Sequence, residues 1–511
     1  MEKRQFEIDN ITWNDLSLED IFSRLNSCIT SAGEDFLYYR LRHPFIADTE
    51  EFRKQKSLFS EIKNINEKDK ITNCLEYLGK IKKYSYLDEI EKCNEESKES
   101  NLKHIIMGIL VIVFFALIFV IPGPAIVAFF IMIGVSVSNY FKTKNVIAGK
   151  LTVFNYTIRM IKTAAKLGSA QICTSSDATL QNVCETLDKL AKEFAPFVRG
   201  TFVISEGART TSNPFSIILD YVRMIFHIDI IKYNSMVLFL HKHIDSAKEC
   251  YKIIGELDVA IVINSFCCGD DFKGLNNSNI CECELYEGEN ELAITDGYHP
   301  MLDEPVENSV NTKKSILLTG CNASGKSTFL KMTALNAVFA QSFGFAFAKD
   351  YRAPYYRIYT SMSLNDSISN GESYYMAEIK SLKRITDAAK ETSNKASVFC
   401  VVDEMLRGTN TIERIAASTE ILKNFDKMGA LCFAATHDIE LAEMLESIYC
   451  NKHFEENIEG NDVSFSFKII DGPAKTRNAI RLLSMLGYDD SIIENATHRA
   501  DVFVSEGKWI L

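Results

Sequence analysis

The chain has 511 residues, 47% hydrophobic and 24% charged, and its formal net charge at pH 7 is −12. At roughly 100–200 residues per domain, this length predicts about three folded units. The acidic balance argues against a protein whose whole surface binds phosphate backbones, because non-specific nucleic-acid binding depends on clustered Lys and Arg. The net charge is still compatible with a basic groove on one part of the surface.

Fourteen cysteines occur in a chain whose first ten residues form no apolar signal sequence. We therefore expect reduced thiols in the cytosol. One group could hold zinc: Cys267, Cys268, Cys281 and Cys283. Their CC and CxC spacing differs from the usual C-x2-C pairing of zinc ligands, which favours buried structural cysteines over a metal site.

Two stretches show the apolar spacing of amphipathic helices. In residues 1–100, Leu16, Ile21, Phe22 and Leu25 recur at helical intervals, and residues 145–285 have a similar pattern. We interpret both as helical segments that serve as a scaffold, because the pattern itself carries no chemistry.

Between them, Ile105 to Phe141 contains no charged residue. One straight helix of this length would measure about 55 Å, so we expect a break at Ile121-Pro122-Gly123-Pro124. The halves, Ile105–Ile121 and Ala125 to about Tyr140, are each about 25 Å long, at the short end for a membrane span. We predict an inserted transmembrane helical hairpin within residues 101–144, with a buried hairpin of a soluble core as the alternative. Lys103, His104, Lys142 and Lys144 flank the run, which predicts cytoplasmic flanks and a turn on the far side.

A phosphate-binding loop is the strongest motif of the C-terminal part. The apolar strand Ser315–Thr319 leads into the G-x4-G-K-S pattern of residues 320–327 and then into a helix beginning near Thr328. Backbone N–H groups of such a loop bind phosphates, its lysine reaches the β- and γ-phosphates, and its serine binds Mg²⁺. We therefore predict an α/β P-loop domain over residues 286–511 that binds ATP and Mg²⁺. The predicted nucleotide-binding residues are Gly320, Asn322, Ser324, Gly325, Lys326, Ser327 and Thr328.

Two further strands end in residues suited to hydrolysis. The apolar run Val398–Val402 ends in Asp403 and Glu404, typical of a buried parallel strand that presents carboxylates at its tip. We predict Asp403 as a metal ligand and Glu404 as the general base. After the strand Ala430–Ala435, His437 lies where a histidine can sense a γ-phosphate, and it resembles the switch histidine of ABC-type ATPases.

The quoted motifs together resemble the MutS family of DNA mismatch-repair ATPases. The loop T-G-C-N-A-S-G-K-S-T-F-L-K is similar to the family's T-G-P-N-M-G-G-K-S-T-x-L-R. Further similar elements are Gly297–Pro300, Ile358–Asp366, Gly371–Glu378 and Arg407–Thr411. More weakly, Trp13–Pro44 and Glu256–Val259 resemble the family's core domain. The resemblance implies a homodimer with composite sites, in which Ser373 acts on the partner's γ-phosphate.

Several positions depart from the family pattern. The core-like region begins too near the first residue for the family's mismatch-reading domain, so we do not expect mismatch recognition by that domain, and no clamp domain is recognisable. Leu406 stands at a glycine position, Ser361 at an arginine position, and Ile412-Glu413-Arg414 where many members have aspartate and glycine.

We therefore expect a membrane-anchored, MutS-like ATPase in which ATP drives a conformational switch. The switch could act on DNA, and the sequence leaves open whether DNA is bound. The localisation expected is the cytoplasmic membrane, with the ATPase domain and the N-terminus in the cytoplasm. The alternative is an ATP-driven membrane-remodelling or tethering protein without DNA binding. A transporter ATPase is disfavoured, because two short spans leave little room for a pathway.

Overall fold

The computed structural model describes residues 6–507 apart from a set of short segments. The segments left out are 65–67, 82–84, 96–99, 149–150, 170–177, 202–213, 270–271, 273, 322–323, 363–373, 392–395, 460–461, 475–479, 481–482 and 484–486. Two compact units form: the first contains Met1–Asn26, Tyr38–Lys56 and Ser265–Leu511, and the second contains Ser27–Leu37 and Ser57–Asn264.

The first unit is mixed α/β, as predicted. Its six-stranded sheet has the order β12-β11-β5-β10-β9-β8, and a four-stranded sheet has the order β2-β7-β3-β4. The strands are β1 (Cys281–Glu282), β2 (Glu284–Tyr286), β3 (Leu292–Gly297), β4 (Asn308–Thr312), β5 (Ile316–Thr319), β6 (Phe345–Ala346), β7 (Asp350–Pro354), β8 (Tyr356–Ser361), β9 (Ser397–Asp403), β10 (Leu431–Ala435), β11 (Cys450–Glu459) and β12 (Asp462–Asp471). The helices are α1 (Asn10–Asp15), α2 (Leu18–Leu25), α16 (Lys326–Phe343), α17 (Tyr374–Lys390), α18 (Thr411–Lys427), α19 (Ile439–Met444) and α21 (Asp490–Glu506).

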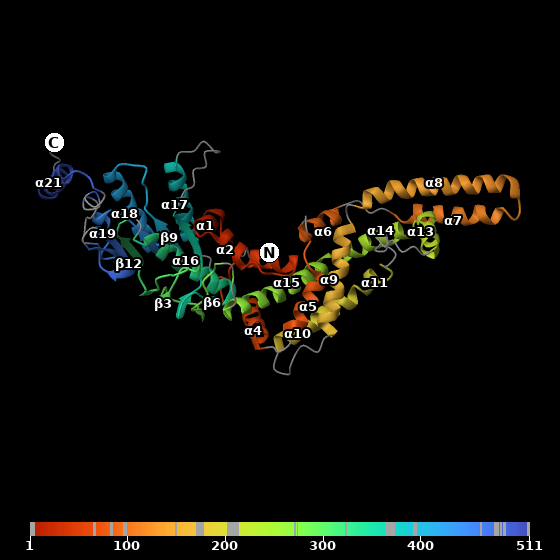
Figure 1. Cartoon of the computed structure of the whole chain (residues 1–511), viewed down its shortest axis with the longest axis horizontal. Helices are drawn as coiled ribbons and strands as arrows, with labels where there is room; N and C mark the ends of the chain where they lie inside the picture. The colour runs from red at the N-terminus through yellow and green to blue at the C-terminus, as the bar shows by residue number, and fades with distance from the viewer. Residues whose placement is uncertain are drawn as a thin grey trace. The chain divides into compact units, whose positions relative to one another are not determined.

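The central strands of the six-stranded sheet are parallel. Strand β10 pairs in parallel with β5 and β9, and β8 pairs in parallel with β9. Figure 1 shows β9 and β12 of this sheet in the same part of the molecule as α16, α18 and α19. Their side chains are apolar and buried on both faces, as expected when helices cover both sides. On one face, Val402 and Cys432 share a core with α17, α18 and α19. On the other, Phe433 stacks against Phe329 of α16.

The N-terminal helix α1 packs against β8 in this unit. Thr12 Oγ1 accepts a hydrogen bond from the Thr360 N–H at 3.1 Å. The Asp15 carboxylate accepts from Thr360 Oγ1 at 2.7 Å and from the Met362 N–H at 3.0 Å. Residues at the start of the chain therefore pack against the edge strand β8 of the six-stranded sheet, more than 340 residues away in the sequence.

The second unit is helical. It contains α5 (Lys68–Leu78), α6 (Tyr86–Glu95), α7 (Leu102–Leu117), α8 (Pro122–Ala148), α9 (Leu151–Ser169), α10 (Ala178–Glu193), α11 (Ala195–Val198), α13 (Pro214–Phe226) and α14 (Ile228–Lys242). The boundaries between the units fall within α3 (Ser31–Arg42), α4 (Glu50–Asn64) and α15 (Ile244–Cys267). Its core includes a tyrosine cluster in which the ring of Tyr86 lies 5.2 Å from that of Tyr156 and 4.8 Å from that of Tyr251.

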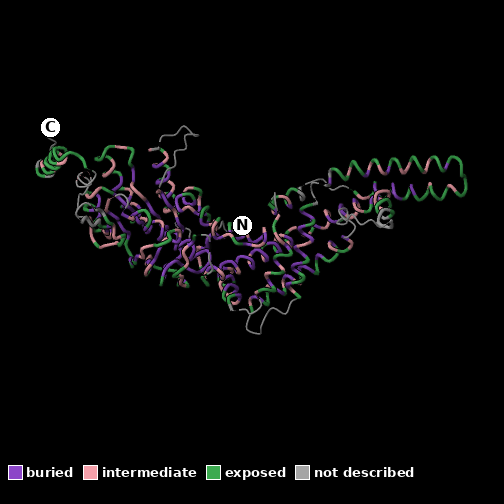
Figure 2. Tube along the Cα trace, in the orientation of Figure 1, coloured by how far each residue is buried: buried purple, intermediate pink, exposed green. Residues whose placement is uncertain are grey.

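Helices α7 and α8 pack against each other and are largely exposed along their length (Figure 2). Among the described residues, Pro122–Asn145 is the one helical stretch long and apolar enough to cross a membrane, judged by length and composition alone. Only 17% of its most apolar window is buried. Helix α7 is apolar but shorter, so two complete spans are not shown.

Of the four candidate zinc cysteines, Cys281 and Cys283 lie in hydrogen-bonding contact with each other. Within the described part of the chain, no group of three or more His, Cys, Asp or Glu side chains is arranged to hold a metal ion. Cys283 is buried, and Cys268 is exposed.

Candidate functional site

The phosphate-binding loop connects the buried strand β5 to the helix α16. Gly320 and Gly325 have φ values of +142° and +106°, which favour glycine. A Cβ at Gly320 would lie 3.0 Å from the Phe454 carbonyl oxygen. The glycines therefore allow a tight turn before α16, whose N-terminus offers free N–H groups to an anion.

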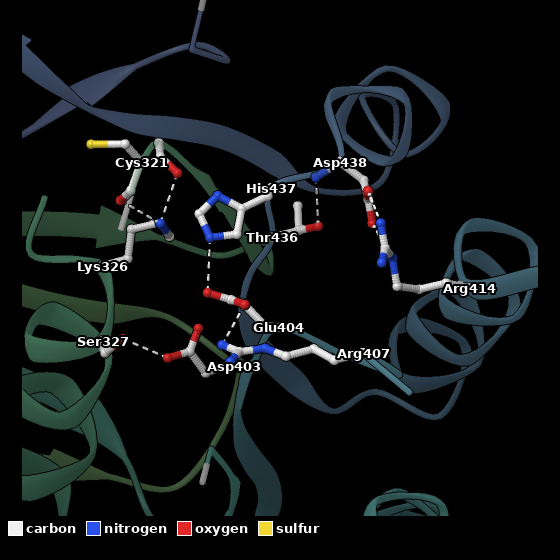
Figure 3. Close-up of polar contacts among 11 residues, drawn as sticks. Cys321, Lys326, Ser327, Asp403, Glu404, Arg407, Arg414, Thr436, His437 and Asp438 are labelled. Atoms are coloured by element: carbon white, nitrogen blue, oxygen red, sulfur yellow. Dashed lines mark hydrogen bonds and ion pairs between the residues drawn. The ribbon is translucent and has the colours of Figure 1, made fainter. Parts of the chain in front are cut away.

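Lys326 begins α16, and its side chain turns back over the loop (Figure 3). Its Nζ donates hydrogen bonds to the carbonyl oxygens of Gly320 and Cys321, both at 2.7 Å. Burial lowers the pKa of Lys326, while Glu404 and Asp403 oppose this shift. The ammonium group is thus held beside the loop, where phosphate oxygens can replace the carbonyls.

Ser327 and Asp403 meet at the end of strand β9. Ser327 Oγ donates to Asp403 Oδ2 at 2.5 Å. Burial raises the pKa of Asp403, and the serine hydrogen bond only partly offsets this. Asp403 Oδ1 is buried and has no hydrogen-bond partner among the described residues. A hydroxyl oxygen and an unsatisfied carboxylate oxygen side by side fit Mg²⁺, which prefers oxygen ligands.

Glu404 follows Asp403 and has a φ of +46°, which non-glycine residues rarely adopt. Its N–H donates to the Ala435 carbonyl at 2.9 Å, because β9 and β10 are paired in parallel register. Glu404 Oε1 lies 2.9 Å from His437 Nε2, and Oε2 pairs with Arg407. Although burial raises the pKa of Glu404, the hydrogen bond from His437 and the nearby cations hold it below its ordinary value. The carboxylate is therefore ionised, as a general base must be.

His437 lies in a turn fixed by an ion pair that the sequence analysis did not identify. Arg414 on α18 binds Asp438 in a bidentate geometry, with Nε–Oδ2 2.9 Å and Nη2–Oδ1 2.6 Å. The Asp438 N–H donates to Thr436 Oγ1 at 3.0 Å. Figure 3 shows this pair to the right of the His437–Glu404 contact.

The hydrogen bond between Glu378 of α17 and Leu406 is a second contact that the sequence analysis did not identify. Glu378 is buried, and its carboxylate accepts the N–H of Leu406, whose φ is +56°. Burial raises the pKa of Glu378. Its position at the end of the Gly371–Glu378 motif was the signal that could have identified it.

The structure brings together Lys326, Ser327, Asp403, Glu404 and His437. Ser324 is buried in the loop, its Oγ having no partner among the described residues, and Thr328 is exposed on the first turn of α16. Asn322 and Ser373 lie outside the described residues.

The C-terminal part of the chain is similar to known proteins. Residues 316–503 match the profile of MutS domain V. The chain is 36% identical over 186 residues to DNA mismatch repair protein MutS 2 of Haloarcula marismortui, which covers 35% of this chain and 19% of that protein. It is 30% identical over 236 residues to DNA mismatch repair protein MutS of Pseudothermotoga lettingae, covering 44% and 28%, and 29% identical over 210 residues to that of Thermus aquaticus, covering 40% and 25%.

These matches support the MutS family for this part of the chain and agree with the sequence motifs. The matched segments span less than a third of the length of these curated relatives.

Proposed function

We propose, from the similarity of residues 316–503 to MutS domain V, that this protein is a membrane-anchored ATPase that binds and hydrolyses MgATP. The observation that carries the proposal is the cluster at the tips of β9 and β10. There Ser327 and Asp403, whose side-chain oxygens could bind Mg²⁺, lie beside the ionised Glu404. Each site is composite within a homodimer, and Ser373 of one subunit completes the site of the other. The match to MutS domain V and the family-like motif Gly371–Glu378, which contains Ser373, support this arrangement.

The residues of this chain divide the work of hydrolysis. Lys326 exchanges the loop carbonyls for β- and γ-phosphate oxygens. Ser327 and Asp403 would hold Mg²⁺, which when bound would neutralise charge on the phosphates. Glu404 accepts a proton from the attacking water, and His437 hydrogen-bonds the γ-phosphate. Both Glu404 oxygens are engaged by His437 and Arg407, so one has to be released when the site closes.

The test is Glu404→Gln in the full-length, detergent-purified protein. We expect ATP binding to persist, turnover to fall by about 100-fold or more, and ATP-bound dimers to accumulate. Glu446→Gln, an exposed residue outside the site, is the matched control and should keep full activity. Unchanged turnover by Glu404→Gln would rule out its role as base.

The protein is attached to the cytoplasmic membrane through residues 105–140, and its first unit lies in the cytoplasm. The apolar exposed surface of α7 and α8 supports this placement. The ATP-driven closure moves the attached helices, which act on DNA in the leading form of the proposal. The names of the relatives support that form.

A membrane-remodelling or tethering ATPase without DNA binding is the second candidate, favoured by the exposed apolar helices and by the net charge of −12. ATPase activity with duplex, branched and mismatched DNA at low salt separates the two. Stimulation or a salt-sensitive mobility shift supports the DNA form. Unchanged turnover and mobility with all three, together with stimulation by vesicles, supports the second candidate.

A further inference from the structure

We infer that the pair of helices α7 and α8 enters the bilayer from one side without crossing it, so that its turn stays in the hydrocarbon and α13 lies at the headgroups. This inference rests on the proposed membrane attachment and gives it a depth and a shape. It differs from the far-side turn expected from the flanking charges alone.

The base of the helix pair is fixed by a buried polar cluster. His104 Nδ1 lies 2.7 Å from His227 Nδ1, and Ser136 Oγ lies 3.1 Å from His227 Nε2. Ser136 Oγ also donates to the Ile225 carbonyl at 2.8 Å. All three side chains are buried. Such a cluster marks the level at which the pair joins the polar part of the second unit.

The apolar reach beyond this level is shorter than a bilayer core. At 1.5 Å per helical residue, α8 rises about 21 Å from Ser136 to Pro122. The other branch, from His104 to the end of α7 at Leu117, rises about 20 Å on the same scale. The hydrocarbon core is about 30 Å thick, and any tilt shortens the reach further. A turn at this distance ends inside the core.

The turn itself has the composition of a lipid-buried segment. Every side chain from Ile105 to Val135 is apolar, or the residue is Gly or Pro. The most exposed large side chains are Phe119 and Val120, at 79% and 73%. A turn that emerged on the far side would place these two side chains among headgroups and water.

Most of the turn's backbone donors, though not the N–H of Gly123, have a hydrogen-bond partner among the described residues. The N–H groups of residues 118–121 donate to carbonyls of residues 115–117. Pro122 and Pro124 have no N–H to satisfy, and the Ala125 N–H donates to the Ile121 carbonyl. In hydrocarbon, an unsatisfied donor is costly, whereas water would satisfy it without such bonds.

Helix α13 lies at the level of the headgroups and so limits how deeply the helix pair enters the bilayer. Its C-terminal end packs on the base of the pair, where a Cβ at Gly108 would lie 3.4 Å from the Phe226 ring. Ile218, Tyr221 and Val222 are exposed and, at spacings of three and four residues, share one face. Asp220 and Arg223 lie on the opposite face. An apolar face with a charged back is the pattern of a helix that lies in the membrane interface.

Cations surround the same end of the pair. Lys103 and Lys142 are exposed, and Lys144 is half-exposed beside Asp229, with its Nζ 3.8 Å from the carboxylate. Lysines at this level attract anionic headgroups, although the chain as a whole is acidic. The partner that fits this surface is therefore one leaflet of an anionic bilayer.

The test labels the turn in proteoliposomes of phosphatidylcholine and phosphatidylglycerol. Gly123→Cys adds a thiol where a Cβ meets nothing within 4 Å, so the fold should tolerate it. A membrane-impermeant maleimide is applied outside, on both sides, or after dissolution in SDS, and labelled peptides are identified by mass. The native, exposed Cys268 reports which molecules face outward.

Each outcome decides. Labelling of residue 123 only after SDS supports the one-sided insertion. Labelling when reagent is also inside the vesicles shows a full crossing and overturns the inference, but not membrane attachment. Labelling from outside overturns both.

A depth measurement checks α13 independently. Tyr221→Trp and Val120→Trp replace exposed residues, and wild-type fluorescence provides the background of the two native tryptophans. Lipids brominated near the headgroup should quench Tyr221→Trp most, and lipids brominated deep in the chain should quench Val120→Trp most. An unquenched Tyr221→Trp, with Val120→Trp quenched, would place α13 in water or against another protein.

Discussion

Arg414 and Asp438 form a bidentate ion pair immediately next to His437. Both side chains are mostly buried, 25% and 14% exposed, and the hydrogen bond to Asp438 raises the pKa of Arg414. The pair connects the first turn of α18 to the turn after β10. It therefore positions His437 through the backbone.

For Arg414→Ala we expect turnover to fall by about 10-fold, because a small misplacement of a catalytic group is expensive in rate. ATP affinity should stay within about twofold, since the loop and Lys326 are untouched. Arg414→Lys should recover only part of the rate, because lysine cannot bind a carboxylate in a bidentate manner. ATPase kinetics and equilibrium ATP binding measure the split; equal losses in both would indicate general misfolding.

His299 provides a prediction on pH. Burial, with a smaller contribution from Lys331, lowers the pKa of His299 to about 4. Its Nδ1 accepts the Met301 N–H at 3.3 Å, which requires the neutral ring. The unfolded chain binds a proton near pH 6.5 and the folded chain does not, so stability is lost as pH falls from about 6.5 to about 4.

The loss from this residue reaches up to about 3 kcal/mol. Urea unfolding at pH 7, 5.5 and 4.5 should show a steeper decline for the wild type than for His299→Gln. Parallel declines in the two proteins would contradict the assignment.

The sequence was sufficient for those site residues that lie next to a strand end. Asp403 ends β9, Glu404 follows it, His437 lies two residues after β10, and Lys326 and Ser327 follow β5 after the glycine loop; parallel strands bring these ends together. Arg414 could not be predicted in this way, because its partner is 24 residues away and only the packing of α18 joins them. The role of Ser373 stays a prediction.

At the scale of elements, α3 and α15 cross closely at glycine. A Cβ at Gly255 would lie 2.4 Å from the Ala32 carbonyl oxygen, and one at Gly33 would lie 2.2 Å from the Asp258 carboxylate. Asp258 in turn accepts the N–H groups of Ile29 and Thr30. Small residues here let a capping carboxylate reach the start of α3.

We expect Gly255→Ala to destabilise the protein by about 1–3 kcal/mol, because backbone has to move to admit the methyl group. Alanine otherwise favours helix, so a helix-propensity effect would have the opposite sign. Glu249→Ala, an exposed position on α15, is the control and should change stability little. Chemical denaturation measures both; a Gly255→Ala protein as stable as wild type would show that the crossing can widen freely.

Element positions were predictable where apolar patterns are strong. Strands β5, β9 and β10 and the break near Pro122 follow the prediction. Helix α8, however, begins at Pro122 and continues to Ala148, beyond the expected limits of Ala125 and Tyr140. Proline is well accommodated in the first helical turn, and loss of apolar character does not itself end a helix.

At the scale of the whole molecule, composite sites predict complementation between inactive variants. Lys326→Ala should lose nucleotide binding in its own subunit. Ser373→Ala should still bind nucleotide but should be unable to complete the site of the partner subunit. Mixed heterodimers then contain one complete site, so random mixing should restore about a quarter of wild-type activity.

The control pairs Lys326→Ala with the double variant Lys326→Ala, Ser373→Ala, which should restore nothing. If Ser373 acted within its own subunit, the first mixture would also stay inactive. ATPase assays after subunit exchange distinguish these cases.

Domain boundaries were the least predictable feature. The sequence pattern separates residues 1–100 from residues 286–511, whereas the first unit contains Met1–Asn26 together with Ser265–Leu511. Helical periodicity identifies α1 as amphipathic but does not identify the strand that it covers. That pairing depends on contacts such as Thr12 with Thr360, 348 residues apart.

This separation sets an order for folding during synthesis. At about 5–20 residues per second, Thr360 follows Thr12 by roughly 20–70 s. Over that interval the segment from Ser57 to Asn264 is completed and can collapse on its own tyrosine-rich core. Thr12, which ends up buried with its hydroxyl on the Thr360 N–H, has to wait for that partner on the nascent chain, so a residue made among the first reaches its final contacts among the last.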